Sequence, residues 1–152
     1  MKAFIIISAA LMAFVCCTPQ PQPISYGNDG CAFCKMTIVD SRYSAELVSD
    51  KGKVFKFDAI ECMVNYDKQN SETIFALKLI SSFDKKELIS AAESHYLRSE
   101  KLPSPMGMYI TGFSDKATAK SFAENHGGAL YTWESLHDNF DSLPEIKPLT
   151  LN

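Results

Sequence analysis

The chain is short, nearly balanced in charge and moderately apolar. It has 152 residues, with 15 lysines and arginines against 18 aspartates and glutamates, so its formal net charge is −3. A protein that binds nucleic acid normally presents a basic face, and this composition offers none. The length beyond an N-terminal leader is enough for one modest domain with a hydrophobic core.

The first residues are typical of an exported protein. A charged start precedes an apolar run over residues 3–15, which is shorter than the roughly 20 residues of a membrane-spanning helix. The run ends in Cys16-Cys17, which resembles a bacterial lipobox, where the cysteine after the cleavage site is acylated. We predict a lipoprotein signal peptide over residues 1–16 and lipid on Cys17, with Cys16 as the alternative, so that the protein is held on a membrane and faces the periplasm or the cell exterior. An uncleaved anchor is the other interpretation.

Composition divides the rest of the chain. Residues 17–30 include a proline- and glutamine-rich stretch with little to bury, which predicts a flexible tether. Residues 31–82 and 83–136 each contain strand and helix patterns and are expected to form two halves of the domain. Two prolines in residues 137–152 favour an irregular C-terminal tail.

The first half is predicted to run strand, strand, helix, strand. Period-two alternation indicates strands over residues 43–49 and 53–57, joined in a hairpin. A helix is expected to begin at Asp58, with Glu61 completing something close to a capping box, and to fade near residue 67. A β-branched and aromatic run over residues 74–80 indicates the third strand.

The second half repeats this order. Strands are expected over residues 96–98 and 108–113, a helix from Ser114 or Asp115 to Asn125, and a last strand over residues 129–133. Residues 83–94 fit either a helix or a loop. The predicted fold class is therefore α+β, a small mixed domain of two ββαβ-type halves.

Sulfur is concentrated just before the first half. Cys31-Ala-Phe-Cys34-Lys-Met36 places two thiols and a thioether within six residues, and soft sulfur donors suit Cu(I). The cation of Lys35 is expected to lower the pKa of a neighbouring cysteine. If Cys17 carries lipid, three thiols remain, and an odd number does not suggest a disulfide framework.

The residues around these cysteines do not favour three other kinds of site that also use two cysteines. A thioredoxin-like redox pair needs a buried strand immediately upstream, where this chain has the predicted tether. Structural zinc needs about four ligands, and only Cys62 and scattered histidines could complete the set. Lys35 stands where haem attachment requires histidine. A disulfide between Cys31 and Cys34 in the empty form stays open.

Three segments, with the lipobox, resemble the NosL family of membrane-tethered copper chaperones that serve assembly of nitrous oxide reductase. They are C-A-F-C-K-M-T-I at residues 31–38, F-D-A-I-E-C-M at 57–63, and P-M-G-M-Y-I-T-G-F at 105–113, which runs on to A-E-N-H-G-G at 123–128. Members are similar in having two ββαβ-type halves. The chain departs from the pattern at Lys35, where many members have glycine, and at Cys34, where many have aspartate.

The resemblance implies a function and a set of ligands. It implies a protein that is not an enzyme, takes no small-molecule substrate and carries Cu(I) to the copper-receiving machinery of nitrous oxide reductase maturation, in denitrification. The metal candidates are Cys31, Cys34, Met36 and Met106, followed by Cys62, Met108 and His126. The third ligand, the membrane involved, the oligomeric state, the copper donor and the direct recipient stay open. The alternative function is a thiol–disulfide redox lipoprotein that uses Cys31 and Cys34.

Overall fold

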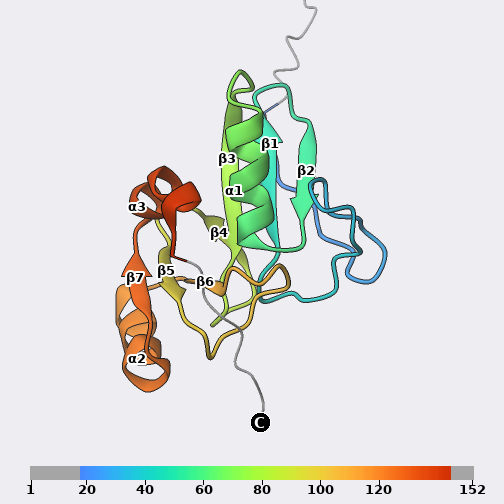
Figure 1. Ribbon diagram of the computed structural model, residues 1–152. Coiled ribbons are helices and arrows are strands. Elements are labelled where there is room, and N and C mark those ends of the chain that lie inside the picture. The colour runs from blue at the N-terminus through green and yellow to red at the C-terminus, as the bar shows by residue number, and fades with distance from the viewer. Residues whose placement is uncertain (1–17, 145–152) are drawn as a thin grey trace, which may run out of the picture.

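The computed structural model describes residues 18–144, which hold seven strands, three α-helices and one short 3₁₀ helix (Figure 1). The predicted signal peptide and the lipid site at Cys16 or Cys17 lie outside these residues. None of the helices in the described part is long and apolar enough to cross a membrane.

The first half is an antiparallel four-stranded sheet in the order β2-β1-β3-β4. Strands β1 (Ala45–Ser49) and β2 (Val54–Phe57) form the expected hairpin, in which Leu47 faces Phe55. Strand β3 (Phe75–Ser81) pairs with the other edge of β1, and the short β4 (Leu88–Ser90) extends the sheet. Helix α1 (Ile60–Gln69) lies against β1 and β2 (Figure 1).

The second half is an antiparallel three-stranded sheet in the order β6-β5-β7. Strands β5 (His95–Arg98) and β6 (Ile110–Phe113) precede α2 (Lys116–His126), and β7 (Ala129–Tyr131) returns beside β5. Helices α2 and α3 (Trp133–Asp138) pack on this sheet, and the 3₁₀ helix η1 (Phe140–Ser142) follows. The predicted α+β fold with two ββαβ-type halves is confirmed.

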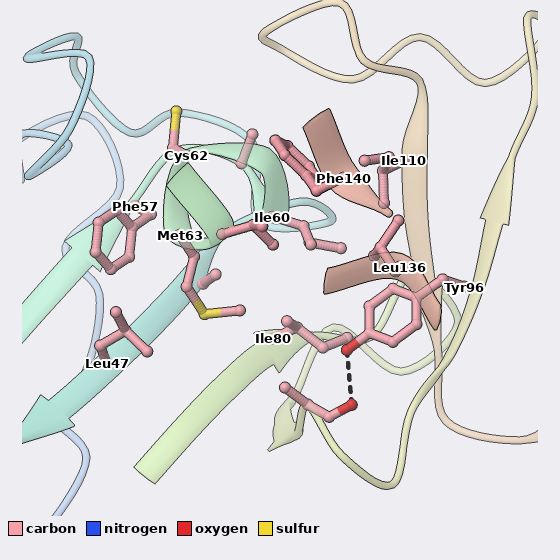
Figure 2. Packing of buried hydrophobic residues seen from close by; sticks show 14 of the residues in the cluster. Leu47, Phe57, Ile60, Cys62, Met63, Ile80, Tyr96, Ile110, Leu136 and Phe140 are labelled. Carbon is pink, nitrogen blue, oxygen red and sulfur yellow. Dashed lines mark hydrogen bonds between the residues drawn. The ribbon is translucent and has the colours of Figure 1, made fainter. Parts of the chain in front are cut away.

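One core joins the halves through α1 and β6. Ile60, Met63 and Ile80 of the first half lie near Tyr96, Ile110 and Leu136 of the second, and all six are fully buried (Figure 2). At Gly112 of β6, an added Cβ would come within 2.4 Å of Ile80 Cδ1. The absence of a side chain at this position therefore lets β6 approach the first sheet closely.

Two local predictions were wrong. Asp58 does not cap α1, because Ala59 takes the N-cap position without a side-chain hydrogen bond and the Glu61 carboxylate turns elsewhere. Trp133 does not end a strand. It begins α3, where Thr132 is the N-cap and exchanges hydrogen bonds with Ser135 in a capping box. The segment 83–94, left open by the sequence, contains β4.

Candidate metal centre

The loop that carries Cys31 and Cys34 is closed on itself by backbone hydrogen bonds. The amide of Cys31 donates to Met36 O at 2.8 Å, and the amide of Lys35 donates to Cys31 O at 3.1 Å. A further bond from Ala32 N to Lys56 O at 2.8 Å holds the loop on the end of β2. The two thiols therefore sit on a tight turn that is anchored to the first sheet.

Lys35 occupies this turn in a left-handed conformation, with φ of 67°. Glycine adopts that region without a steric penalty, whereas a residue with a Cβ does not. Glycine would therefore fit this position of the turn with less strain than the lysine that occupies it.

The third thiol comes from α1. Cys62 lies in the first turn of the helix, where its amide donates to Ala59 O at 3.1 Å. Figure 2 shows its sulfur on the opposite side of α1 from the side chain of Met63, which points into the core. This orientation brings Cys62 to the loop of Cys31 and Cys34, and the three Sγ atoms lie within 4.8 Å of one another.

The three cysteines differ in exposure. Cys31 and Cys62 are buried, with 2 % and 1 % of their surfaces exposed, whereas Cys34 is partly exposed. All three are free thiols. The group is thus reached from outside through Cys34, while the other two sulfurs lie behind it.

Hydrogen bonding favours one thiolate. The Cys62 thiol donates to Cys31, and together with backbone amides of Asp58, Cys34 and Phe33 it lowers the pKa of Cys31 to about 5, against the opposing effect of burial. The same contact raises the pKa of Cys62, and burial raises that of Cys34. The predicted influence of Lys35 is not found, because its Nζ donates to Ala32 O at 2.6 Å and the Cys31 shift has other causes.

Two buried carboxyl groups lie near the cysteines, and the sequence predicted them as parts of a helix cap and not as buried groups. Asp58 is 2 % exposed, and burial, followed by the nearby Cys31, raises its pKa. Glu61 is 1 % exposed, and its Oε1 accepts hydrogen bonds from Ser104 Oγ and, at 3.4 Å, from Met108 N. Glu61 therefore ties α1, beside Cys62, to the loop that contains Met106 and Met108.

The methionine and histidine candidates lie in different environments. Met36 follows Lys35 with 54 % of its surface exposed, and Met106 is 38 % exposed. Met108 is partly buried and packs against the main core. His126 ends α2, where its Nδ1 contacts Phe122 O at 3.0 Å. Among the described residues, only the three cysteines form a cluster of histidine, cysteine or acidic side chains that could hold a metal ion.

The sequence ranked Cys62 below the other cysteines because an isolated cysteine in a helix is usually a small buried hydrophobe. Two signals were available in the sequence, namely the place of Cys62 near the start of a predicted helix and its position in the F-D-A-I-E-C-M segment at residues 57–63. Its meeting with Cys31 depends on the packing of α1 against β2, which sequence spacing does not reveal.

The fold and the site together define a small α+β protein with three converging thiols that could hold a soft metal ion. The NosL family model matches residues 23–140, and the chain belongs to the NosL family. Among solved structures, the chain is similar to the copper chaperone NosL from Shewanella denitrificans, with a TM-score of 0.66 and 21% sequence identity over 77% of this chain and 95% of that chain. No curated protein matches the chain.

Proposed function

We propose that this protein is a membrane-anchored, extracytoplasmic carrier that binds Cu(I) and delivers it during maturation of nitrous oxide reductase. The observation that carries the proposal is the convergence of Cys31, Cys34 and Cys62, whose Sγ atoms lie within 4.8 Å of one another. Thiolates are soft ligands that select Cu(I) over harder cations. Membership in the NosL family and the likeness to a solved copper chaperone support copper as the metal.

The number of thiols favours copper over structural zinc. Structural zinc sites are almost always tetrahedral, with four protein ligands. In residues 18–144 the group holds three cysteines, and no histidine or carboxylate joins them. Cu(I) has a filled d shell and is satisfied by two or three soft ligands. The three cysteines therefore suit a monovalent copper ion better than a closed zinc site.

Partial exposure of one ligand suits a carrier. Cys34 is the accessible member of the group, while Cys31 and Cys62 are buried. A receiving protein can add a ligand from the side of Cys34 before the buried thiols release the ion. Met36 and Met106 expose their thioethers and remain candidates to complete the coordination sphere. The low pKa of Cys31 also means that this ligand binds without first losing a proton at neutral pH.

The cysteine cluster does not bear on export, lipidation or the destination of the copper, which are supported by the sequence. The apolar leader that ends in Cys16-Cys17 supports a lipid anchor on the outer side of a membrane. Delivery to nitrous oxide reductase follows from the resemblance of the sequence to the NosL family. These parts of the proposal are tested by labelling cells with a fatty-acid analogue and by measuring copper in nitrous oxide reductase from cells that lack this protein.

The metal-binding claim is tested by titrating the full-length protein with Cu(I), without oxygen, against a competing Cu(I) chelator. We expect a one-to-one complex, and Cys31→Ser is expected to weaken it more than about 100-fold, beyond the usual cost of losing a supporting partner. Cys62→Ser tests the member contributed by α1. Met63→Leu, on the opposite side of α1, is the matched control and should bind copper normally. Copper binding that survives Cys31→Ser would contradict the proposal.

One observation favours a second candidate function. A thiol with a pKa of about 5, separated by two residues from a partly exposed thiol, is also the arrangement of a redox pair. A thiol–disulfide redox lipoprotein would reduce a disulfide substrate through Cys31 and Cys34 in the absence of copper. Reduction of a model disulfide by the parent, lost in both Cys31→Ser and Cys34→Ser, together with weak copper binding, would favour this function instead.

A further inference from the structure

A buried arginine stands at the end of β5, on the second sheet. Arg98 is 6 % exposed, and its Nε donates to Met108 O at 3.1 Å while Nη2 donates to Pro144 O. Nη1 donates to no group in residues 18–144. No carboxylate in that part of the chain lies within ion-pairing distance of Arg98. Two carbonyl oxygens thus satisfy some of its donors, and no carboxylate of the described residues pairs with it directly.

An unbalanced buried charge is unusual. Burial of a guanidinium away from water is unfavourable unless an opposite charge compensates for it. Neutral carbonyl groups provide hydrogen bonds but not an anion. An anion in direct contact with Arg98 would therefore be stabilised, and none of the described residues supplies one.

Arg98 also lines an open cavity of about 370 Å³. The wall also contains the cation of Lys101 and the carboxylate of Glu100, besides the uncharged side chains of Tyr131 and a neutral His126, so it carries one more positive than negative charge. Gly128 forms another part of the wall, and a Cβ there would approach Arg98 O to 2.3 Å. Glycine thus allows β7 to pass close to the backbone of Arg98.

We propose that this cavity is an oxyanion-binding site, in which a carboxylate or phosphate accepts hydrogen bonds from Arg98 and is attracted by Lys101. A guanidinium with an N–H donor to spare can hydrogen-bond the oxygens of a carboxylate or a phosphate. None of the three metal-binding cysteines lines the cavity, so the site is separate from the candidate metal centre and does not depend on copper binding.

Two sources could supply the oxyanion. Glu145 follows Pro144, whose carbonyl accepts from Arg98 and whose side chain lines the cavity. Its carboxylate is tethered and would have a high effective concentration at the site. The other source is a small free oxyanion. Both present the same chemistry to Arg98, and the experiment separates them.

The test measures the melting temperature of the full-length protein as inorganic phosphate or succinate is added, with sodium chloride at matched ionic strength as the reference. A ligand that binds only the folded state raises the melting temperature in a saturable way. A saturable rise in the parent identifies a free anion as the ligand. No rise in the parent, but a rise in Glu145→Gln, identifies the tail carboxylate as the occupant. Either result supports the site.

Variants locate the binding. Arg98 also holds Met108 and Pro144, so Lys101 is the better position to change. Lys101→Gln, made in whichever protein responds, is expected to raise the apparent dissociation constant about threefold or more, as loss of one exposed charge contact does. Lys120→Gln, an exposed lysine of α2 outside this cavity, is the control and should change nothing. The proposal is overturned if the added anion raises the melting temperature of neither the parent nor Glu145→Gln. It is also overturned if Lys101→Gln leaves the apparent dissociation constant unchanged.

Discussion

Ser104 and Glu61 are forty-three residues apart in the sequence, and Ser104 Oγ donates a hydrogen bond to Glu61 Oε1 inside the protein. Both side chains are buried. Ser104 Oγ also accepts from Tyr109 N at 2.8 Å, which closes the loop that carries Met106 and Met108. One carboxylate next to Cys62 therefore fixes a loop of the second half.

Loss of the Glu61 acceptor should loosen this loop. Glu61→Ala leaves Ser104 Oγ and Met108 N without their shared partner, and each buried unsatisfied group costs about 1–3 kcal/mol. We expect urea unfolding to show a loss of roughly 2–4 kcal/mol, with altered NMR signals of the Met106 and Met108 methyl groups. Glu61→Gln keeps an acceptor oxygen and should retain most of the stability. Equal losses in the two variants would show that the hydrogen bonds are not the cause.

The hydrogen bond from Cys62 should control the ionisation of Cys31. Cys62→Ala removes the largest cause of the lowered Cys31 pKa, so this pKa should rise from about 5 toward the ordinary thiol value of 9.0. Cys62→Ser keeps a donor and should show a smaller rise. Ultraviolet thiolate absorbance of the metal-free protein as a function of pH measures the change. A Cys31 titration that is the same in Cys62→Ala and the parent would contradict this account.

The same shift predicts how stability depends on pH. Because the folded-state pKa of Cys31 lies below its unfolded-state value, ionisation contributes stability that is complete above pH 9 and is lost as the pH falls toward 5. In Cys62→Ala this part of the profile should flatten. The thiolate absorbance and the pH dependence of unfolding must therefore give the same folded-state pKa for Cys31.

Lys35 should be replaceable by glycine with a gain in stability. A residue with a Cβ pays about 1–2 kcal/mol in the left-handed region, while glycine loses about 0.5–1 kcal/mol more entropy on folding. Lys35→Gly is expected to raise the free energy of unfolding by up to about 1 kcal/mol. Lys85→Gly, at an exposed lysine without a positive φ, should give no gain. A destabilised Lys35→Gly would mean that the bond from Lys35 Nζ to Ala32 O outweighs the strain.

A buried carboxyl group in β1 should make the protein less stable at neutral pH. Glu46 is fully buried, Gln22 N donates to its Oε1 at 2.9 Å, and its Oε2 has no partner in the described residues. Burial raises the pKa of Glu46, so the folded state holds this proton more tightly than the unfolded state does. The fold has its full stability below the unfolded-state pKa of about 4.3 and loses part of it as the pH rises through the higher folded-state value.

Glu46→Gln, which cannot ionise, should therefore be more stable than the parent at pH 8, with the difference vanishing below about pH 4. Urea unfolding at several pH values measures this difference. Glu72→Gln removes an exposed carboxylate and controls for the change in net charge. A Glu46→Gln protein that is equally stabilised at every pH would point to packing rather than to ionisation.

Patterns that are local in the sequence predicted most of the fold. The hairpin of β1 and β2 and helix α2 follow from side-chain periodicity and from glycine at a turn or helix end, which act within a few residues. The sequence predicts that Trp133 ends a strand, yet the Thr132–Ser135 capping box starts helix α3 at this residue. Asp58 failed as a cap because Ala59 takes the N-cap position and Glu61 bonds to Ser104 instead.

Local sequence patterns also predicted only part of the candidate site. Cys31 and Cys34 could be selected from their spacing, since a turn of three residues keeps their sulfurs close. Cys62 and Glu61 could not, because their roles depend on contacts with residues about 30 and 43 positions away. Sequence alone carries no distance between such segments.

The three thiols belong to two segments, the loop of Cys31 and Cys34 and the first turn of α1. A copper ion held by both would act as a removable cross-link that closes a ring of about thirty residues and so restricts the unfolded chain. The loaded and empty proteins would then differ in mechanical stiffness as well as in metal content.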